Sequence, residues 1–143
     1  MWQLTEHLKK EFRRTDLITP RDRVELVDAT IYFVNNEPRY FKQGERIIPT
    51  LRFLLKTSDV LRKVVVDMGA IPFITKGADI FRPGIKDIDP LIRAGELVVV
   101  VDQTHGKPLC VGEALLCGEE IKAKEKGVSI KNIHYVGDRI WVM

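Results

Sequence analysis

The sequence predicts a small α+β unit followed by a mainly-β barrel of short strands with two short helices. Three observations lead to this fold class. Two early segments carry apolar residues at helical spacing, short runs rich in β-branched residues fill much of the later chain, and Gly, Pro and Asn separate those runs. We place the boundary after residue 62, so that residues 1–62 form the α+β unit and residues 63–143 form the barrel.

The first unit is expected to combine two helices with strands. Apolar residues recur every four positions among charged ones, which predicts an amphipathic helix over residues 4–14. Residues 23–34 and 39–42 alternate and favour strands, and the segment NNEP between them favours a turn. Pro49 opens an apolar segment of helical period, where a proline suits the first turn because its missing N–H has no partner there.

The second unit is expected to begin with a buried strand over residues 63–67 and about two helical turns over residues 68–77. Gly77 suits the left-handed residue that ends such a helix. A strand over residues 78–81 follows, and Pro83-Gly84 fits the central pair of a type II turn.

The rest of the barrel is expected to consist of two hairpins around a helix. Strands over residues 96–102 and 109–116 are joined by a polar connection, and a charged helix over residues 118–127 closes at Gly127. Strands over residues 133–136 and 139–142 flank Gly137-Asp138, which suits a type II′ turn.

Composition favours a globular, intracellular protein. The chain is 45% apolar and 30% charged, its longest aliphatic run is far too short to cross a bilayer, and its first residues lack the apolar core of a signal peptide. Two cysteines are too few for a disulfide framework. The net charge of +3 lies entirely in the first 62 residues, so an anion site in the second unit must be built locally.

The irregular segment ITKGADIFRPG, residues 74–84, has two interpretations. A glycine with positive φ exposes neighbouring amides and removes a Cβ, so Gly77 between Lys76 and Arg82 suits a sugar–phosphate backbone. The same residues also suit a helix end followed by a strand corner. The residues alone leave both interpretations open.

A family resemblance favours the first interpretation. From Asp67 onward, DMGAIPFITKGADIFRPGI, LCVGEALL and VSIKNIHYVGDRIWVM resemble a PUA domain, an RNA-binding fold. Together with IIPTLRFLLKT, they are similar to the malignant T-cell amplified sequence proteins and ligatin, translation factors of the small ribosomal subunit. The resemblance covers nearly the whole chain and implies a pseudobarrel. It implies RNA contacts at Lys76, Gly77, Ala78, Asp79, Ile80, Arg82, Pro83 and Gly84, with His134 and Tyr135 as weaker candidates.

We therefore predict a non-enzymatic, cytoplasmic RNA-binding protein that acts in translation, at the small ribosomal subunit or on tRNA, through structured RNA. The resemblance also implies a SUI-domain protein as a partner. No catalytic residue set, metal ion, cofactor or membrane contact is expected. Two alternatives stay open, an accessory subunit of an RNA-modification enzyme and a protein-interaction module. A basic patch for rRNA is predicted at Lys9, Lys10, Arg13 and Arg14.

Overall fold

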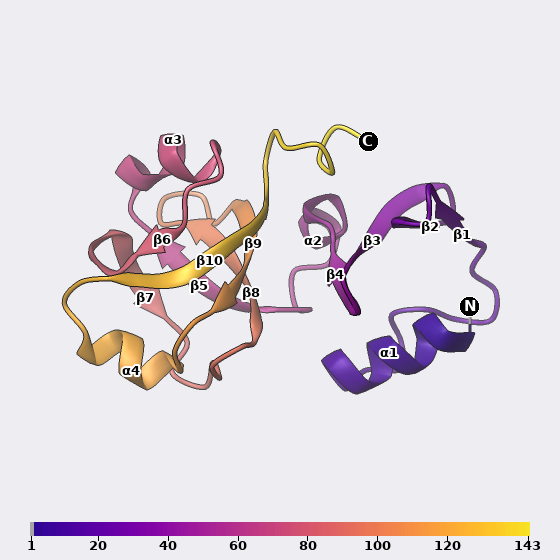
Figure 1. Cartoon of the computed structure of the whole chain (residues 1–143), viewed down its shortest axis with the longest axis horizontal. Helices are drawn as coiled ribbons and strands as arrows, with labels where there is room; N and C mark the ends of the chain where they lie inside the picture. Colours follow the sequence, from indigo (N-terminus) through magenta and orange to yellow (C-terminus); the bar gives the residue numbers. More distant parts are fainter. Residues whose placement is uncertain (1) are drawn as a thin grey trace.

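The computed structural model describes residues 2–143 and arranges them in two β-sheets with short helices around them (Figure 1). The first sheet contains four strands, and the second contains six. Figure 1 shows the two sheets side by side, with α3 (Ile71–Ile74) above and α4 (Gly118–Ala123) below the second sheet, and α1 (Trp2–Phe12) below the first sheet.

The first unit is an antiparallel meander between two helices. Its elements are α1 (Trp2–Phe12), β1 (Val24–Val27), β2 (Ile31–Val34), β3 (Glu37–Gln43), β4 (Arg46–Pro49) and α2 (Leu51–Lys56). The predicted strand over residues 23–34 is two strands, because Asp28 and Ala29 take φ values of 51° and 52° and reverse the chain. Asn35 and Asn36 make the next reversal with positive φ, which suits asparagine.

Helix α2 begins at Leu51, two residues after Pro49, where the sequence pattern predicted its start. Pro49 is the last residue of β4, a strand that the sequence pattern missed. Thr50 caps the helix, because its Oγ1 accepts a hydrogen bond from the N–H of Phe53 at 3.2 Å. The same hydroxyl donates to the carbonyl of Pro38 at 2.8 Å, which ties the helix start to β3.

The second unit is mainly β, as predicted, and its two α-helices are short. Its elements are β5 (Arg62–Val66), a 3₁₀ turn η1 (Met68–Ala70), α3 (Ile71–Ile74), β6 (Ile80–Phe81), a 3₁₀ turn η2 (Arg82–Gly84), β7 (Ile85–Ile88), β8 (Leu97–Asp102), β9 (Pro108–Ala114), α4 (Gly118–Ala123) and β10 (Val128–Tyr135). This sheet has the strand order β6-β10-β9-β8-β5-β7, in which β5 and β8 are parallel and the other neighbouring pairs are antiparallel.

Strand β8 is buried on both faces and joins the two units. Val98 and Val100 face the core of the second unit. Leu97, Val99 and Val101 pack instead into a cluster shared with β2, β3, β4 and α2. Because both faces of the strand are buried, its sequence is a continuous run of aliphatic residues rather than an alternation of apolar and polar residues.

Three local expectations for the second unit are wrong, and one of its strands was not expected. Gly84 lacks the positive φ of a type II turn, because residues 82–84 form η2. The strand that was not expected is β7. Helix α4 ends at its C-cap Lys124, so Gly127, with φ of +100°, leads into β10 instead. Residues 139–142 form turns rather than a strand. Asp138 explains this last difference, because its Oδ1 accepts a hydrogen bond from the N–H of Trp141 at 2.8 Å and winds the chain back.

Within residues 2–143, no helix is both long and apolar enough to cross a membrane.

Candidate nucleic-acid interface

The loop between α3 and β6 is held by its own main chain. Gly77 has φ of +95°, which confirms the predicted left-handed residue at the end of this helix. The amides of Lys76 and Gly77 donate to the carbonyls of Phe73 and Ile74, and the amide of Ala78 also donates to Phe73. These amides are therefore already hydrogen-bonded, and the prediction that they are free to hold a phosphate is wrong.

Strand β10 braces this loop from inside the protein. The Nδ2 of Asn132 donates to the carbonyls of Ile74 at 3.1 Å and Ala78 at 2.9 Å. The main-chain N–H of Asn132 donates to Oδ1 of Asp79 at 2.9 Å. Asn132 thus fixes both ends of the loop, a role that nothing in the local sequence pattern indicated.

Tyr135, also on β10, covers the α-carbon of Gly77. A Cβ at Gly77 would lie 3.1 Å from Cε1 of Tyr135, tighter than a normal van der Waals contact. The glycine is therefore needed twice, for its positive φ and for the close approach of the tyrosine ring. Its bare face is occupied by the protein itself, so the predicted open main-chain patch at Gly77 is not present.

Arg82 is turned inward, and its predicted role as a free cation is wrong. Its Nη1 donates to the carbonyl of Ile85 at 3.0 Å and its Nη2 to the carbonyl of Lys122 at 3.5 Å. Its main-chain N–H donates to Gly127 at 2.8 Å. Arg82, with Pro83 and Gly84 in η2, therefore forms a structural corner between β7 and α4.

His134 is fully buried, so its predicted RNA contact is also wrong. Its Nε2 accepts a hydrogen bond from the N–H of Leu51 at 3.0 Å, and Nδ1 must then carry the proton, which it donates to Oδ2 of Asp138 at 2.8 Å. Burial lowers the pKa of His134 below its ordinary value, although the hydrogen bond with Asp138 acts in the opposite direction. His134 therefore links the start of α2 to the C-terminal turn.

Several other side chains of these elements are exposed. Lys76 is exposed on the loop, as predicted, whereas Ile80 is buried in the core, so its predicted RNA contact is wrong. Phe73 on α3 is 66% exposed and Phe81 on β6 is 54% exposed. We define the α3–β6–β10 surface as the exposed side chains of Phe73, Lys76, Asp79 and Phe81 together with the half-buried ring of Tyr135. The two phenylalanines were not predicted, although Phe81 follows directly after a buried residue on a strand and must face the other way.

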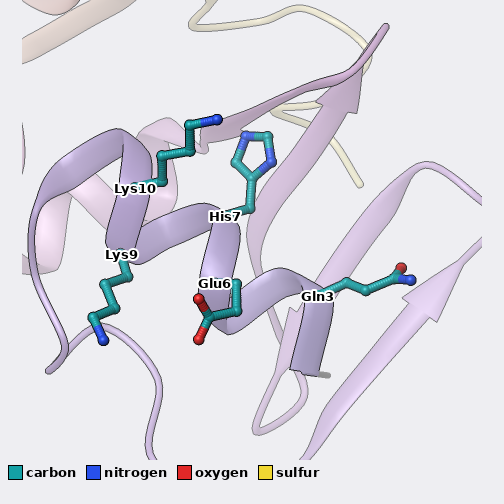
Figure 2. A pocket seen from close by; sticks show the side chains of 5 residues that line it. All are labelled: Gln3, Glu6, His7, Lys9 and Lys10. Atoms are coloured by element: carbon teal, nitrogen blue, oxygen red, sulfur yellow. The ribbon is translucent and has the colours of Figure 1, made fainter.

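The four basic residues predicted to form a patch at the end of α1 do not form one continuous basic surface. Figure 2 shows a shallow depression on α1 in which Lys9 and Lys10 point in different directions and Glu6 lies between Gln3 and Lys9 along the helix. Arg13 is exposed beyond the helix end. Arg14 is neutralised, because its guanidinium pairs with Asp16 at 2.7 Å and Asp59 at 3.2 Å.

Comparisons with known families identify both parts of the chain. Residues 62–136 match the PUA domain, and residues 6–57 match a domain of unknown function, DUF1947.

Similar proteins include three curated relatives. The chain is 46% identical over 143 residues to the Uncharacterized protein MJ1432 of Methanocaldococcus jannaschii, covering 97% of this chain and 88% of that protein. It is 33% identical over 136 residues to Translation machinery-associated protein 20 of Saccharomyces cerevisiae, covering 88% of this chain and 75% of the yeast protein. It is 39% identical over 117 residues to Malignant T-cell-amplified sequence 1 of Rattus norvegicus, covering 79% of this chain and 64% of the rat protein.

Solved structures share the fold. A PUA domain from Aeropyrum pernix superposes with a TM-score of 0.87 and 25% identity, covering 98% of this chain and 83% of that chain. A second similar structure is that of an H/ACA RNP bound to a substrate RNA. One of its chains matches this chain with a TM-score of 0.55 and 26% identity. The match covers 68% of this chain and 29% of the other chain.

Proposed function

The chain belongs to the PUA-domain family, and we propose that it is an RNA-binding protein that acts in translation and catalyses no reaction. Its RNA ligand binds the α3–β6–β10 surface. The match of residues 62–136 to the PUA domain and the relative named for the translation machinery support this assignment.

One observation carries the proposal. The loop that bears Lys76 is fixed by Asn132 and Tyr135, while Phe73 and Phe81 expose large aromatic rings to solvent. A cation on a rigid loop can contact a phosphate without losing much conformational freedom, and exposed rings can stack on unpaired bases. A structured RNA with unpaired nucleotides offers both groups.

The finer assignment extends this proposal. We place the action of the protein in the cytoplasm, at the small ribosomal subunit or on tRNA, with a SUI-domain protein as a partner. We also propose that residues 1–62 and 63–143 act as two domains, of which the first orients the second on its target. The buried contact of β8 with the first unit supports a fixed orientation.

A second candidate function is an accessory, RNA-targeting subunit of an RNA-modification enzyme. The observation that favours it is the similarity to a chain of the H/ACA RNP, whose structure contains a substrate RNA. In that case catalysis belongs to another protein.

Cross-linking of the protein to RNA in cells, followed by sequencing of the attached RNA, tests the proposed function. We expect small-subunit rRNA or tRNA, and copurification with small ribosomal subunits. Copurification with a modification enzyme and its RNA, without ribosomal subunits, would favour the second candidate instead. Absence of any cross-linked RNA would contradict both.

A further inference from the structure

A second, separate charged surface lies between the two units. A groove of about 1300 Å³ is lined by the end of α1, by the connection from α2 into β5, by the segment between β7 and β8, and by α4. Among the described residues, none from positions 66–86 lines it. Figure 1 shows α1 and α4 on the lower side of the molecule and α3 on the upper side, so this groove is distinct from the α3–β6–β10 surface.

Ion pairs within the protein use only part of the charge in this groove. Arg46 pairs with Glu11 and Glu113, and Arg62 pairs with Asp89 and Glu96. Arg14 pairs with Asp59 in the same way. These three arginines hold neighbouring acidic side chains in place and are not free to bind a ligand.

The remaining cations of the groove have no ion-pair partner within residues 2–143. They come from both units: the α1 end and the barrel each contribute. They are Lys10, Arg13, Lys63, Arg93 and Lys122. Of the acidic side chains that line the groove, Asp87 alone is unpaired in the described chain, and its Oδ1 accepts a hydrogen bond from the N–H of Ile88.

We propose that this inter-unit groove binds the sugar–phosphate backbone of an RNA double helix, as a second RNA contact of the protein. Five exposed cations without partners suit a row of phosphates, because each neutralised phosphate releases a bound counterion. The ligand class rests on the proposed function, whereas the groove and its charge do not.

The lining favours a helix over a single strand. Binding of single-stranded RNA generally relies on aromatic rings on which bases stack. The aromatic residue of the groove is Phe12, which is half-buried and packs against the core cluster of the first unit and the cluster that the two units share. The groove therefore contacts phosphates and riboses, and the exposed rings of Phe73 and Phe81 serve unpaired nucleotides on the other surface.

A charge-reversal pair tests this assignment. The double variant Lys63→Glu and Arg93→Glu is compared with the control Lys107→Glu and Lys126→Glu, which reverses two exposed cations outside the groove. Affinity for a blunt RNA duplex of about 20 base pairs is measured over a range of salt concentrations. We expect about tenfold weaker binding or more for the groove variant, a salt slope shallower by about two, and no change for the control.

The outcomes separate this inference from the proposed function. Unchanged duplex binding in the groove variant, together with weaker RNA binding in Lys76→Glu, would overturn the inference and leave the proposed function standing. A wild-type protein that binds neither duplex nor single-stranded RNA would overturn both. Groove-dependent binding of polyglutamate without duplex binding would assign the groove to an acidic protein segment and overturn the inference. Lys10→Glu with Lys122→Glu provides an independent second pair.

Discussion

Replacing Gly77 by valine should weaken RNA binding by more than about tenfold and lower the free energy of unfolding by about 2–3 kcal/mol. Two costs combine at this position. A β-branched residue resists φ of +95°, and the added side chain would meet the ring of Tyr135, which lies only 3.1 Å from an ideal Cβ. The loop must then move away from β10 and carry Lys76 with it. Binding titrations and chemical unfolding of the same samples measure both effects.

Gly44→Val is a matched control for this variant. Gly44 also has a positive φ, of 61°, but an added Cβ would meet no atom within 4 Å. The control therefore shares the conformational cost and lacks the collision. We expect it to lose stability, by about 1–2 kcal/mol, and to retain RNA affinity. Equal RNA affinity of Gly77→Val and the wild type would contradict the role of the braced loop.

Replacing His134 by alanine should lower the free energy of unfolding by about 3 kcal/mol. The substitution leaves a cavity against Phe41, whose ring lies 5.3 Å from the imidazole, centroid to centroid. It also leaves the N–H of Leu51 without its acceptor at the start of α2. Chemical unfolding near neutral pH measures the loss. His105→Ala, at an exposed hairpin tip, should change stability by less than about 0.5 kcal/mol.

The pH dependence of stability tests the same residue. The pKa of His134 is lowered in the folded protein, so the unfolded chain binds the proton first, near its ordinary pKa of 6.5. The contribution of neutral His134 to the free energy of unfolding is therefore fully present above pH 6.5. It is lost as the pH falls below 6.5 toward the pKa of His134 in the folded protein. Hydrogen bonds lower the pKa values of Asp22 and Asp102 below their ordinary value of 3.8. These two carboxylates therefore lose their contribution to the free energy of unfolding only below that pH, and they do not interfere with the measurement of His134.

Comparison of the wild type with His134→Ala at about pH 7.5 and about pH 5.5 isolates this effect. The wild type should lose free energy of unfolding over this interval, and the variant should lose less. Equal losses would show that His134 does not carry the pH dependence.

Much of the fold could be predicted because local signals agreed with the tertiary structure. Gly77, for example, closes the turn after α3 with a positive φ, as its position after the helical segment predicted. The failures occurred where partners distant in sequence decide the structure. Asp138 winds the chain back through a hydrogen bond from Trp141, so residues with strand propensity form turns. Thr50 shifts the start of α2 because it can bond to β3.

The candidate site was predicted only in part, for a similar reason. Sequence identifies Arg82 as a cation, but the carbonyls of Ile85 and Lys122 that use its guanidinium are set by folding. His134 likewise finds its partner at Leu51, 83 positions away. The inter-unit groove could not be predicted at all, because its cations come from segments that approach each other only in the folded chain.

The most direct test of the α3–β6–β10 surface is a salt titration of RNA binding by Lys76→Glu beside Lys107→Glu, which reverses an exposed lysine outside this surface. Lys76 is exposed on a braced loop, so its reversal should reduce affinity for a structured RNA by about tenfold and make the salt slope shallower by about one. The Lys107 variant should match the wild type. If Lys76→Glu bound RNA with wild-type affinity and slope, RNA would not bind at this surface.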